Sequence, residues 1–317
     1  GSENWLTSHY APGQTHSQNI ADGLYPTEDP VARAQLCLGC HLGSDNPNQF
    51  ITHRIMGAGH PRISFELDLF TSLQEHHYED EDYMQRKDYA NGVKTWAVGQ
   101  AIALQTQLEL FADPDLGRQG AFPELVFFDC HACHVTFSND PNWRPTWRTN
   151  PDRLLGPGVP VFNDSNLIML KAAVKVVAPD LDNELRQAGL RFHRTVSESG
   201  GSYMAATNQL AALAERISVR MANSEFSKDD MVAILSNIVN DSVSSSYTEY
   251  SAAEQAVIAI GTFLDAMQSE DYISASVYDS FAPALDDAYE AVDDPNRYDY
   301  YRMRNAVQRI RNQIGQL

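Results

Sequence analysis

Two five-residue stretches constrain this chain more than any other feature of its sequence. Residues 37–41 and residues 130–134 both have the form C-x-x-C-H, and together they contain all four cysteines of the chain. This pattern is typical of covalent attachment of a c-type haem, because two thiols at this spacing bond to the two vinyl groups of one porphyrin. The histidine that follows is then placed to bind the iron. The sequence therefore predicts two c-type haems, with these attachment and proximal-ligand residues: Cys37, Cys40, Cys130, Cys133, His41 and His134.

Two other uses of paired cysteines explain the motifs less well. The two pairs could together form one zinc site with four cysteine ligands, but that use leaves the histidine after each pair unexplained. A thioredoxin-like redox pair requires a βαβ setting, and the sequence around neither motif has that pattern. We therefore expect haem at both motifs.

The second axial ligand of each iron must come from elsewhere, and the ten histidines of the chain supply most candidates. His53 and His60 are seven residues apart, so in a helix they would share one face about 10 Å apart. Such a pair could serve two neighbouring haems, or one histidine could bind iron while the other hydrogen-bonds a propionate. Gly57 and Gly59 between them would let the backbone approach a porphyrin closely. His9 is the next candidate.

Other side chains near the motifs have weaker claims to a haem role. His131 is expected to point away from its own iron, and His193 to face solvent or a propionate. Arginines around the haem segments could neutralise propionates, and we expect that role for one or two of them. The remaining candidates are His76, His77, Met56, Met84 and Met169 as ligands, and Arg54, Arg62, Arg144, Arg148 and Arg153 as propionate partners.

Charge and hydropathy limit the possible partners. The 317 residues include 23 basic and 42 acidic side chains, which gives a formal net charge of −19. Nucleic acid and anionic membrane surfaces are therefore poor partners, whereas basic redox proteins, including other haem proteins, are good ones. No run of 18 apolar residues is present, so we expect no membrane span. Covalent haem attachment takes place outside the bacterial cytoplasm, which favours a periplasmic or extracellular location. The polar opening Gly1-Ser2-Glu3 predicts that a leader was removed or that the sequence starts late.

The pattern of apolar residues predicts a mainly α protein in two parts. Residues 1–160 form the expected dihaem cytochrome domain, with little regular structure apart from helices near 29–36, 64–73 and 93–111. A solvated acidic loop is expected at 79–82. Residues 161–317 have helical periodicity and form the expected second domain, an antiparallel bundle. Its predicted helices cover 164–195, 203–223, 227–241, 249–269, 275–292 and 297–315.

The haem-bearing part resembles a known family. Residues 36–43, followed by His53 and by residues 58–67, resemble multihaem cytochromes of the cytochrome c-554 type. Residues 96–100 and 128–134 extend the resemblance, which covers roughly residues 3–160. It implies mostly bis-histidine haems packed close together, with His53 and His60 at distal-ligand positions. His9 matches a histidine that in relatives follows a further C-x-x-C-H-G motif, which this chain lacks, so the chain has fewer haems or begins after them.

Three functions are compatible with these features. A dihaem electron carrier between redox partners is favoured over an enzyme, because two axial histidines saturate an iron and leave it only electrons to exchange. The alternative is a dihaem redox enzyme, of the peroxidase or the nitrogen-oxide or sulfur reductase type, with one open iron. A third possibility is a sensor whose helical half binds a ligand or partner. The oxidised optical and EPR spectra distinguish the first two, since an open iron has a high-spin component.

Overall fold

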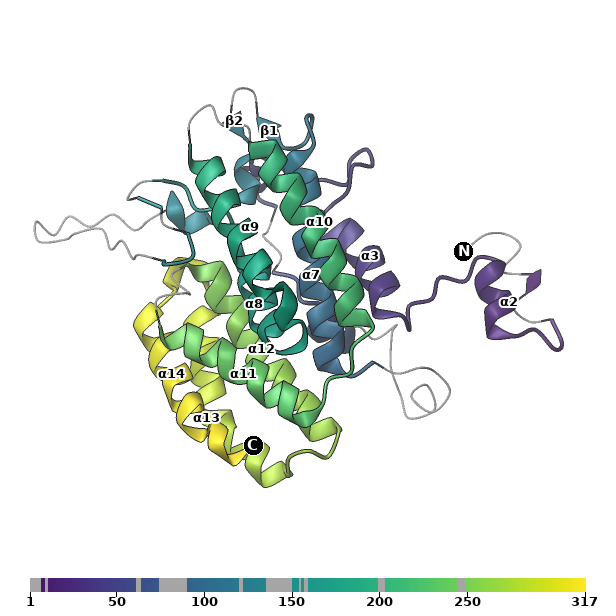
Figure 1. The fold of residues 1–317 in the computed structure, drawn as a ribbon, viewed down its shortest axis with the longest axis vertical. Helices are drawn as coiled ribbons and strands as arrows, with labels where there is room; N and C mark the ends of the chain where they lie inside the picture. Colours follow the sequence, from purple (N-terminus) through teal and green to yellow (C-terminus); the bar gives the residue numbers. More distant parts are fainter. Residues whose placement is uncertain are drawn as a thin grey trace, which may run out of the picture.

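The computed structural model describes residues 7–8, 11–60, 64–73, 90–119, 122–134, 150–153, 155–156, 159–198, 203–244 and 249–317. As the sequence predicts, these residues form a mainly α-helical protein (Figure 1). The first helices are α2 (His16–Ala21), α3 (Pro30–His41), α4 (His53–Gly57), α5 (Leu67–Ser72) and α7 (Gly92–Ala112). A two-stranded antiparallel hairpin, β1 (Arg118–Gln119) and β2 (Phe122–Pro123), follows α7 and precedes two 3-10 turns, η1 (Leu125–Phe127) and η2 (Cys130–Ala132).

The second half of the chain supplies the longer helices of the bundle. They are α8 (Ser165–Val177), α9 (Pro179–Ser197), α10 (Tyr203–Ala222), α11 (Lys228–Val243), α12 (Tyr250–Ser269), α13 (Ala275–Val292) and α14 (Tyr300–Gln313). The 3-10 turns η3 (Pro295–Arg297) and η4 (Ile314–Gln316) lie on either side of α14.

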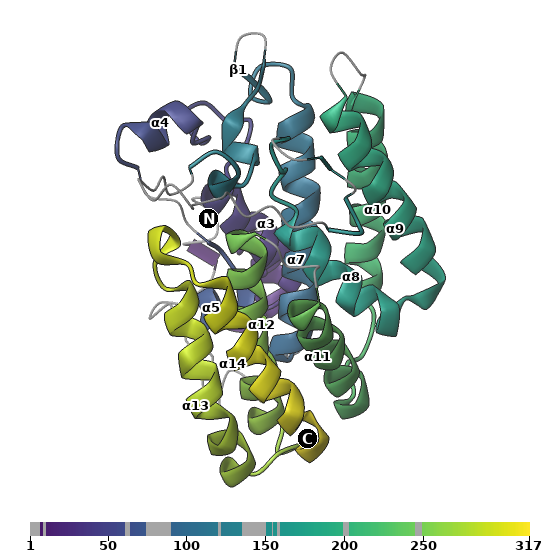
Figure 2. The same cartoon turned by 90° about the vertical axis from the view of Figure 1, so that its left-hand side faces the viewer.

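Helix α7 lies at the centre of this arrangement. It contacts α3 and α5 from the first half of the chain and α8, α10 and α12 from the second half, as the two views show (Figures 1 and 2). Most of its side chains are buried, including Trp96, Leu104 and Phe111. A helix that is apolar all round belongs in a core rather than at a surface. The buried apolar side chains from Ala34 to Ile310 accordingly form one hydrophobic core.

One predicted helix proves to be two. Residues 164–195 were expected to be continuous, but α8 ends at Val177 and α9 begins at Pro179. Proline has no backbone N–H and disfavours helical dihedral angles in the residue before it. Ala178 accordingly has φ −140° and ψ 56°, outside the helical region. The helix expected at 64–73 is also shorter, because Glu66 caps α5 by accepting hydrogen bonds from Asp68 and Leu69.

The division of the chain near residue 160 stays a prediction. Because α7 packs against three helices of the second half, the two parts share the core in this structure. A shared core does not by itself show whether either part folds alone. The acidic loop expected at 79–82 lies outside the described residues. In the part of the chain that the structure describes, no helix is long and apolar enough to cross a membrane.

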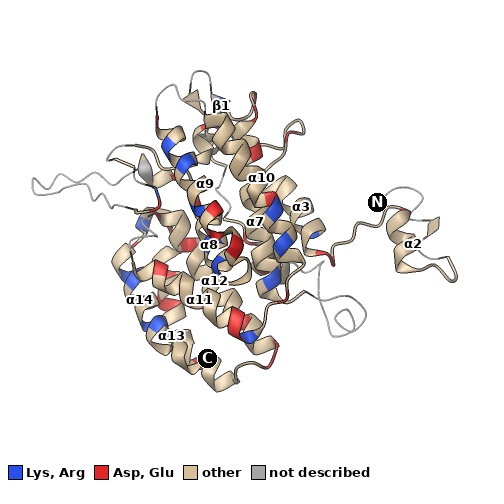
Figure 3. Ribbon diagram, viewed as in Figure 1, with Lys and Arg blue, Asp and Glu red and all other residues tan. Residues whose placement is uncertain are grey.

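Acidic and basic side chains are interspersed on the outer helices (Figure 3). Arg302 on α14 pairs with Asp287 on α13 at 2.6 Å, and Arg216 on α10 pairs with Glu184 on α9 at 2.9 Å. Exposed pairs of this kind contribute little to stability, because water and salt screen them. These pairs nevertheless neutralise Asp287 and Glu184 on a protein whose net charge is strongly negative.

Candidate haem-binding site

The first motif lies on an α-helix. Asp29 accepts a hydrogen bond from the backbone N–H of Val31, and Pro30 takes the first helical position of α3, where its missing N–H costs nothing. The predicted helix at 29–36 continues in the structure through His41. Residues three and four apart on a helix share a side, so Cys37, Cys40 and His41 lie on one face. The helix therefore presents two thiols and one imidazole on the same side.

Aromatic side chains surround the histidine of the first motif. The ring of His41 stacks on Phe65, with ring centres 4.5 Å apart, and Phe70 lies 6.1 Å away. Burial lowers the pKa of His41, which favours the neutral imidazole that binds metal ions. Burial also raises the pKa of the Cys37 thiol, although Arg33 acts in the opposite direction.

The second motif has a different backbone. Its first three residues form the 3-10 turn η2, and the backbone N–H of His134 donates to the Cys130 carbonyl at 2.7 Å. Asp129 caps this turn by accepting a hydrogen bond from the His131 N–H at 2.9 Å. The other carboxylate oxygen of Asp129 accepts from the Ser251 hydroxyl at 3.0 Å, which ties the motif to the start of α12.

His131 is used to anchor the second motif. Its Nε2 lies 2.5 Å from the carbonyl oxygen of Pro295, and its ring centre is 5.2 Å from that of Tyr250. Both partners belong to the second half of the chain. The side chain therefore contacts the second half of the chain, and its expected orientation away from an iron stays a prediction.

A cavity of about 350 Å³ brings the two motifs together. Cys40 and His41 line it from the first motif and Cys130 lines it from the second. The other polar or sulfur-bearing residues of the wall are His60, Met56, Asn48, Gln49, Gln107, Asn163 and Ser251. The apolar part of the wall has these side chains: Leu42, Phe50, Ile51, Leu110, Val126, Phe127 and Phe128. Ligand cavities commonly have volumes of about 300–1,000 Å³ and mostly apolar walls. Thiols, imidazoles and aromatic walls are the groups that covalent attachment, iron ligation and a porphyrin face require, so these residues fit a c-type haem.

The structure also places His53 opposite the second motif. The ring centres of His53 and His134 are 6.2 Å apart, and the ring planes differ by 40°. Two imidazoles that bind one metal ion from opposite sides, each at a metal–nitrogen distance of about 2 Å, have ring centres about 6 Å apart. The spacing of His53 and His134 therefore matches that of an axial pair.

His53 and His60 do not share a helical face. Helix α4 ends at Gly57, and Gly59 has φ +107°, in the left-handed region that ends a helix readily at glycine. The two histidines consequently point to separate places, His53 towards His134 and His60 into the cavity wall. The premise of a continuous helix from 53 to 60 is thus wrong, while the idea that the two histidines serve different haems stays a prediction.

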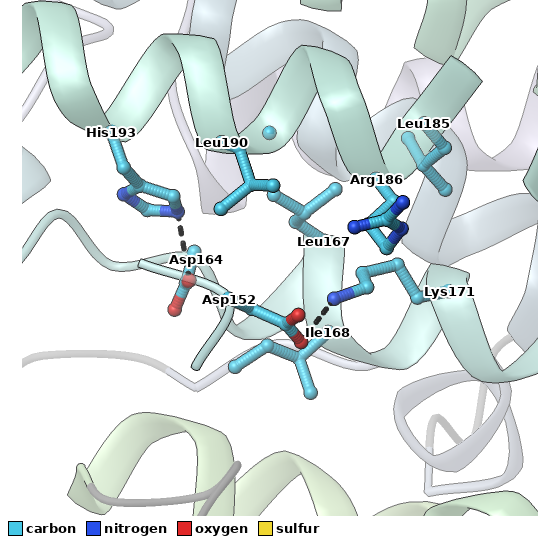
Figure 4. A pocket seen from close by; sticks show the side chains of 10 residues that line it. Asp152, Asp164, Leu167, Ile168, Lys171, Leu185, Arg186, Leu190 and His193 are labelled. Atoms are coloured by element: carbon cyan, nitrogen blue, oxygen red, sulfur yellow. Dashed lines mark hydrogen bonds and ion pairs between the residues drawn. The ribbon is translucent and has the colours of Figure 1, made fainter. Parts of the chain in front are cut away.

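Two residues that the sequence analysis placed at the surface or at a haem propionate are buried in other surroundings. His193 was expected to face solvent or a propionate, but it is 2% exposed and its Nε2 lies 3.0 Å from Asp164 (Figure 4). Arg153 is 3% exposed, and its guanidinium pairs with Asp164 and with Glu249. Burial alone would raise the pKa of Asp164, but Arg153 and His193 beside it hold the pKa below its usual value. These groups form a charge cluster at the starts of α8 and α12 and on α9, and its carboxylates pair with Arg153 where a propionate was expected.

The remaining candidates separate into four groups. Met169 is fully buried in α8, within the helical core, whereas Met56 lines the cavity. Arg54 is exposed on α4. The others lie outside the described residues: His9, His76, His77, Met84, Arg62, Arg144 and Arg148.

Sequence reasoning missed two carboxylates that hold the site. Glu124 accepts a hydrogen bond from the backbone of His53, 71 residues away, and nothing in the local sequence indicates that contact. Asp129 had a local signal, because an aspartate directly before a helical turn is a common cap. Both residues are buried beside the second motif.

Among the described residues, no three or more His, Cys, Asp and Glu side chains gather in the arrangement of a metal site. The four cysteine thiols are all described and do not form such a group. A haem iron needs only two protein ligands beside the four porphyrin nitrogens.

Comparison with known proteins finds no matching family model, no matching curated protein and no matching solved structure.

Proposed function

We propose that this protein is a dihaem c-type cytochrome, of the cytochrome c-554 type, that transfers electrons between redox partners. The observation that carries the proposal is the meeting of both C-x-x-C-H motifs at one apolar cavity with two further histidines beside them. Zinc or redox thiols would not need the apolar wall or the extra imidazoles.

Each residue near the motifs has a place in this proposal. Cys37 and Cys40 attach one haem, and Cys130 and Cys133 attach the other. His41 and His134 are the proximal ligands by the spacing of the motif. The 6.2 Å spacing favours His53 as the partner of His134. That leaves His60, which lines the same cavity as His41, as the partner of the first motif.

The bound haems would supply one-electron exchange between ferric and ferrous iron. The chain itself would fill both axial positions of each iron with histidine, which excludes substrate from the metal. Its aromatic walls would keep water from the porphyrin faces, and burial of this kind influences the reduction potential. With a formal charge of −19, the protein would select partners that present a basic surface. Because c-type haems are attached outside the bacterial cytoplasm, the place of action would be periplasmic or extracellular.

The test begins with the holoprotein made in cells that attach c-type haem. Its intact mass should exceed the polypeptide mass by two haems, and the oxidised protein should have two low-spin EPR signals. A mass with one haem or none, or with bound zinc, contradicts the proposal. A high-spin component in the unaltered protein would instead favour the dihaem enzyme.

Single variants test the ligand assignment. His60→Ala and His53→Ala should each open one iron, and a different one, to carbon monoxide. His16→Ala is the matched control, because His16 pairs with Glu28 away from the cavity and its loss should leave both haem spectra unchanged. If His60→Ala leaves both irons closed to carbon monoxide, the ligand of the first haem is another residue, such as His9 or His77.

A further inference from the structure

Glu124 connects the helix that carries His53 to the segment that leads into the second motif. One carboxylate oxygen accepts hydrogen bonds from the backbone N–H of His53 at 2.7 Å and from that of Val126 at 3.3 Å. The side chain is only 2% exposed. A buried carboxylate is costly unless hydrogen bonds satisfy it, so its position is tied to these two donors.

Within the described part of the chain, helix α4 has few other contacts that hold it in place. It has only five residues, and none of them is buried. Thr52 caps the helix through a bond to Ile55, within the same segment. His53 is its first residue, and its N–H is one of the donors that a helix leaves without an internal partner. Apolar packing therefore does not fix the orientation of α4, and the contact to Glu124 reaches outside the segment.

The segment that carries Glu124 is fixed by contacts with the core. Its backbone N–H donates to the Gly117 carbonyl at 2.9 Å, and the following turn η1 carries the buried Phe127. Phe127 stacks on Phe50, with ring centres 5.6 Å apart, and Phe50 lies three residues before His53 in the chain. The carbonyl of Phe127 accepts from Asn163 at 2.8 Å. The segment that holds Glu124 is thus fixed to the core six residues before Cys130.

We propose that Glu124 is a positioning residue that holds His53 in place to ligate the haem of the second motif opposite His134. This inference rests on the proposed function, since it requires a haem at residues 130–134. Glu124 does not touch the iron in this arrangement. It acts through the backbone of the ligand, in the way that groups around a metal site orient the ligands.

The test compares four variants of the dihaem holoprotein by EPR and by the rate of carbon monoxide binding to the reduced protein. His53→Ala defines the signature of the open second iron. Glu124→Ala should give the same signature at partial occupancy, with a rate of carbon monoxide binding at that iron raised about tenfold or more. Glu124→Gln keeps an acceptor oxygen and should restore the low-spin signal. The double variant Glu124→Ala with His53→Ala should match His53→Ala alone, because both changes act on one ligand.

A matched control separates positioning from loss of stability. Glu66 is also buried and also accepts backbone hydrogen bonds at the start of a short helix, but it belongs to α5 beside the first motif. Glu66→Ala should not open the second iron. If Glu66→Ala and Glu124→Ala give the same high-spin signal, the effect is general destabilisation and the proposal is overturned.

The remaining outcomes are also decisive. An iron that stays closed in Glu124→Ala, while His53→Ala opens it, overturns the role of Glu124 and leaves the proposed function intact. If His53→Ala opens neither iron, the assignment of His53 fails, and a protein without two haems contradicts the proposed function itself. If Glu124→Ala does not fold, Glu124→Asp replaces it, because one methylene less keeps the charge but shifts the acceptor and should still open the second iron in part.

Discussion

The two haem motifs have the same sequence pattern but different structures. The first continues the α-helix α3 against the core, whereas the second is a 3-10 turn held by Asp129 at the start of α12. Both backbones place a histidine one turn after a cysteine, as the proposed haem attachment would need. The comparison shows that the same five-residue pattern occurs on two different local backbones.

The second residue of each motif shows how the two are anchored. In the first motif it is Leu38, which is 2% exposed and packs in the hydrophobic core. In the second motif the equivalent residue is His131, which contacts Pro295 and Tyr250. One position thus anchors each motif, by apolar burial in one case and by a polar contact in the other.

The largest expected effect tests the apolar anchor. Leu38→Ala should lower the free energy of unfolding by about 2–5 kcal/mol, because it removes a buried side chain and leaves a cavity. Chemical denaturation of the holoprotein measures the change. Leu36→Ala is the control on the same helix, since Leu36 is 46% exposed and its loss should cost little. Equal costs for the two variants would mean that α3 does not pack on the core as described.

The second prediction concerns the region beside the first motif. Burial raises the pKa of Glu66 to about 7, against its hydrogen bonds from Leu69, Asp68 and Thr262. The folded protein therefore keeps a proton that the unfolded chain loses near the usual value of 4.5. The contribution of this proton to the free energy of unfolding is complete below pH 4.5. It is lost as the pH rises to about 7, which lowers the free energy of unfolding by roughly 3 kcal/mol at about 1.4 kcal/mol per pKa unit.

Glu66→Gln should remove this fall, because the amide does not titrate. Unfolding measured between pH 4 and pH 8 gives the slope for both proteins. Glu109→Gln, at an exposed site on α7, serves as the control and should keep the slope of the unaltered protein. A slope that persists in Glu66→Gln would assign the pH dependence to another group.

The third prediction compares the caps of the two motifs. Asp29→Ala removes an exposed cap of α3 and should cost about 1 kcal/mol. Asp129→Ala removes a buried cap and also leaves the Ser251 hydroxyl without its acceptor, so it should cost about 2 kcal/mol or more. Denaturation of both holoproteins makes the comparison. Equal values would show that the polar contacts of the second motif add no more than an ordinary cap.

The smallest expected effect tests whether α3 stays helical when haem is attached. Gly39 lies within the helix, and an added Cβ would meet no atom within 4 Å. Gly39→Ala should therefore stabilise the holoprotein by about 0.5–1 kcal/mol, because alanine loses less backbone freedom in a helix. Loss of stability or of haem would instead indicate that the porphyrin covers this position.

Local patterns in the sequence predicted much of the secondary structure. The mainly α fold and most helix boundaries in the second half followed from apolar periodicity and from caps such as Ser227. The break at Pro179 also has a local cause and could have been predicted from the proline. The burial of His193 could not, because it depends on Asp164 reaching it from the start of α8.

The sequence by itself determined the two C-x-x-C-H motifs and the haem prediction that rests on their spacing, because residue types and spacing are read directly from the chain. Only the tertiary structure brought His53 to His134 and placed Glu124 beneath His53, across 81 and 71 residues respectively. It also decided that both motifs border one cavity. Contacts over such separations depend on how the helices pack around α7, and packing is set by the whole core rather than by any short pattern.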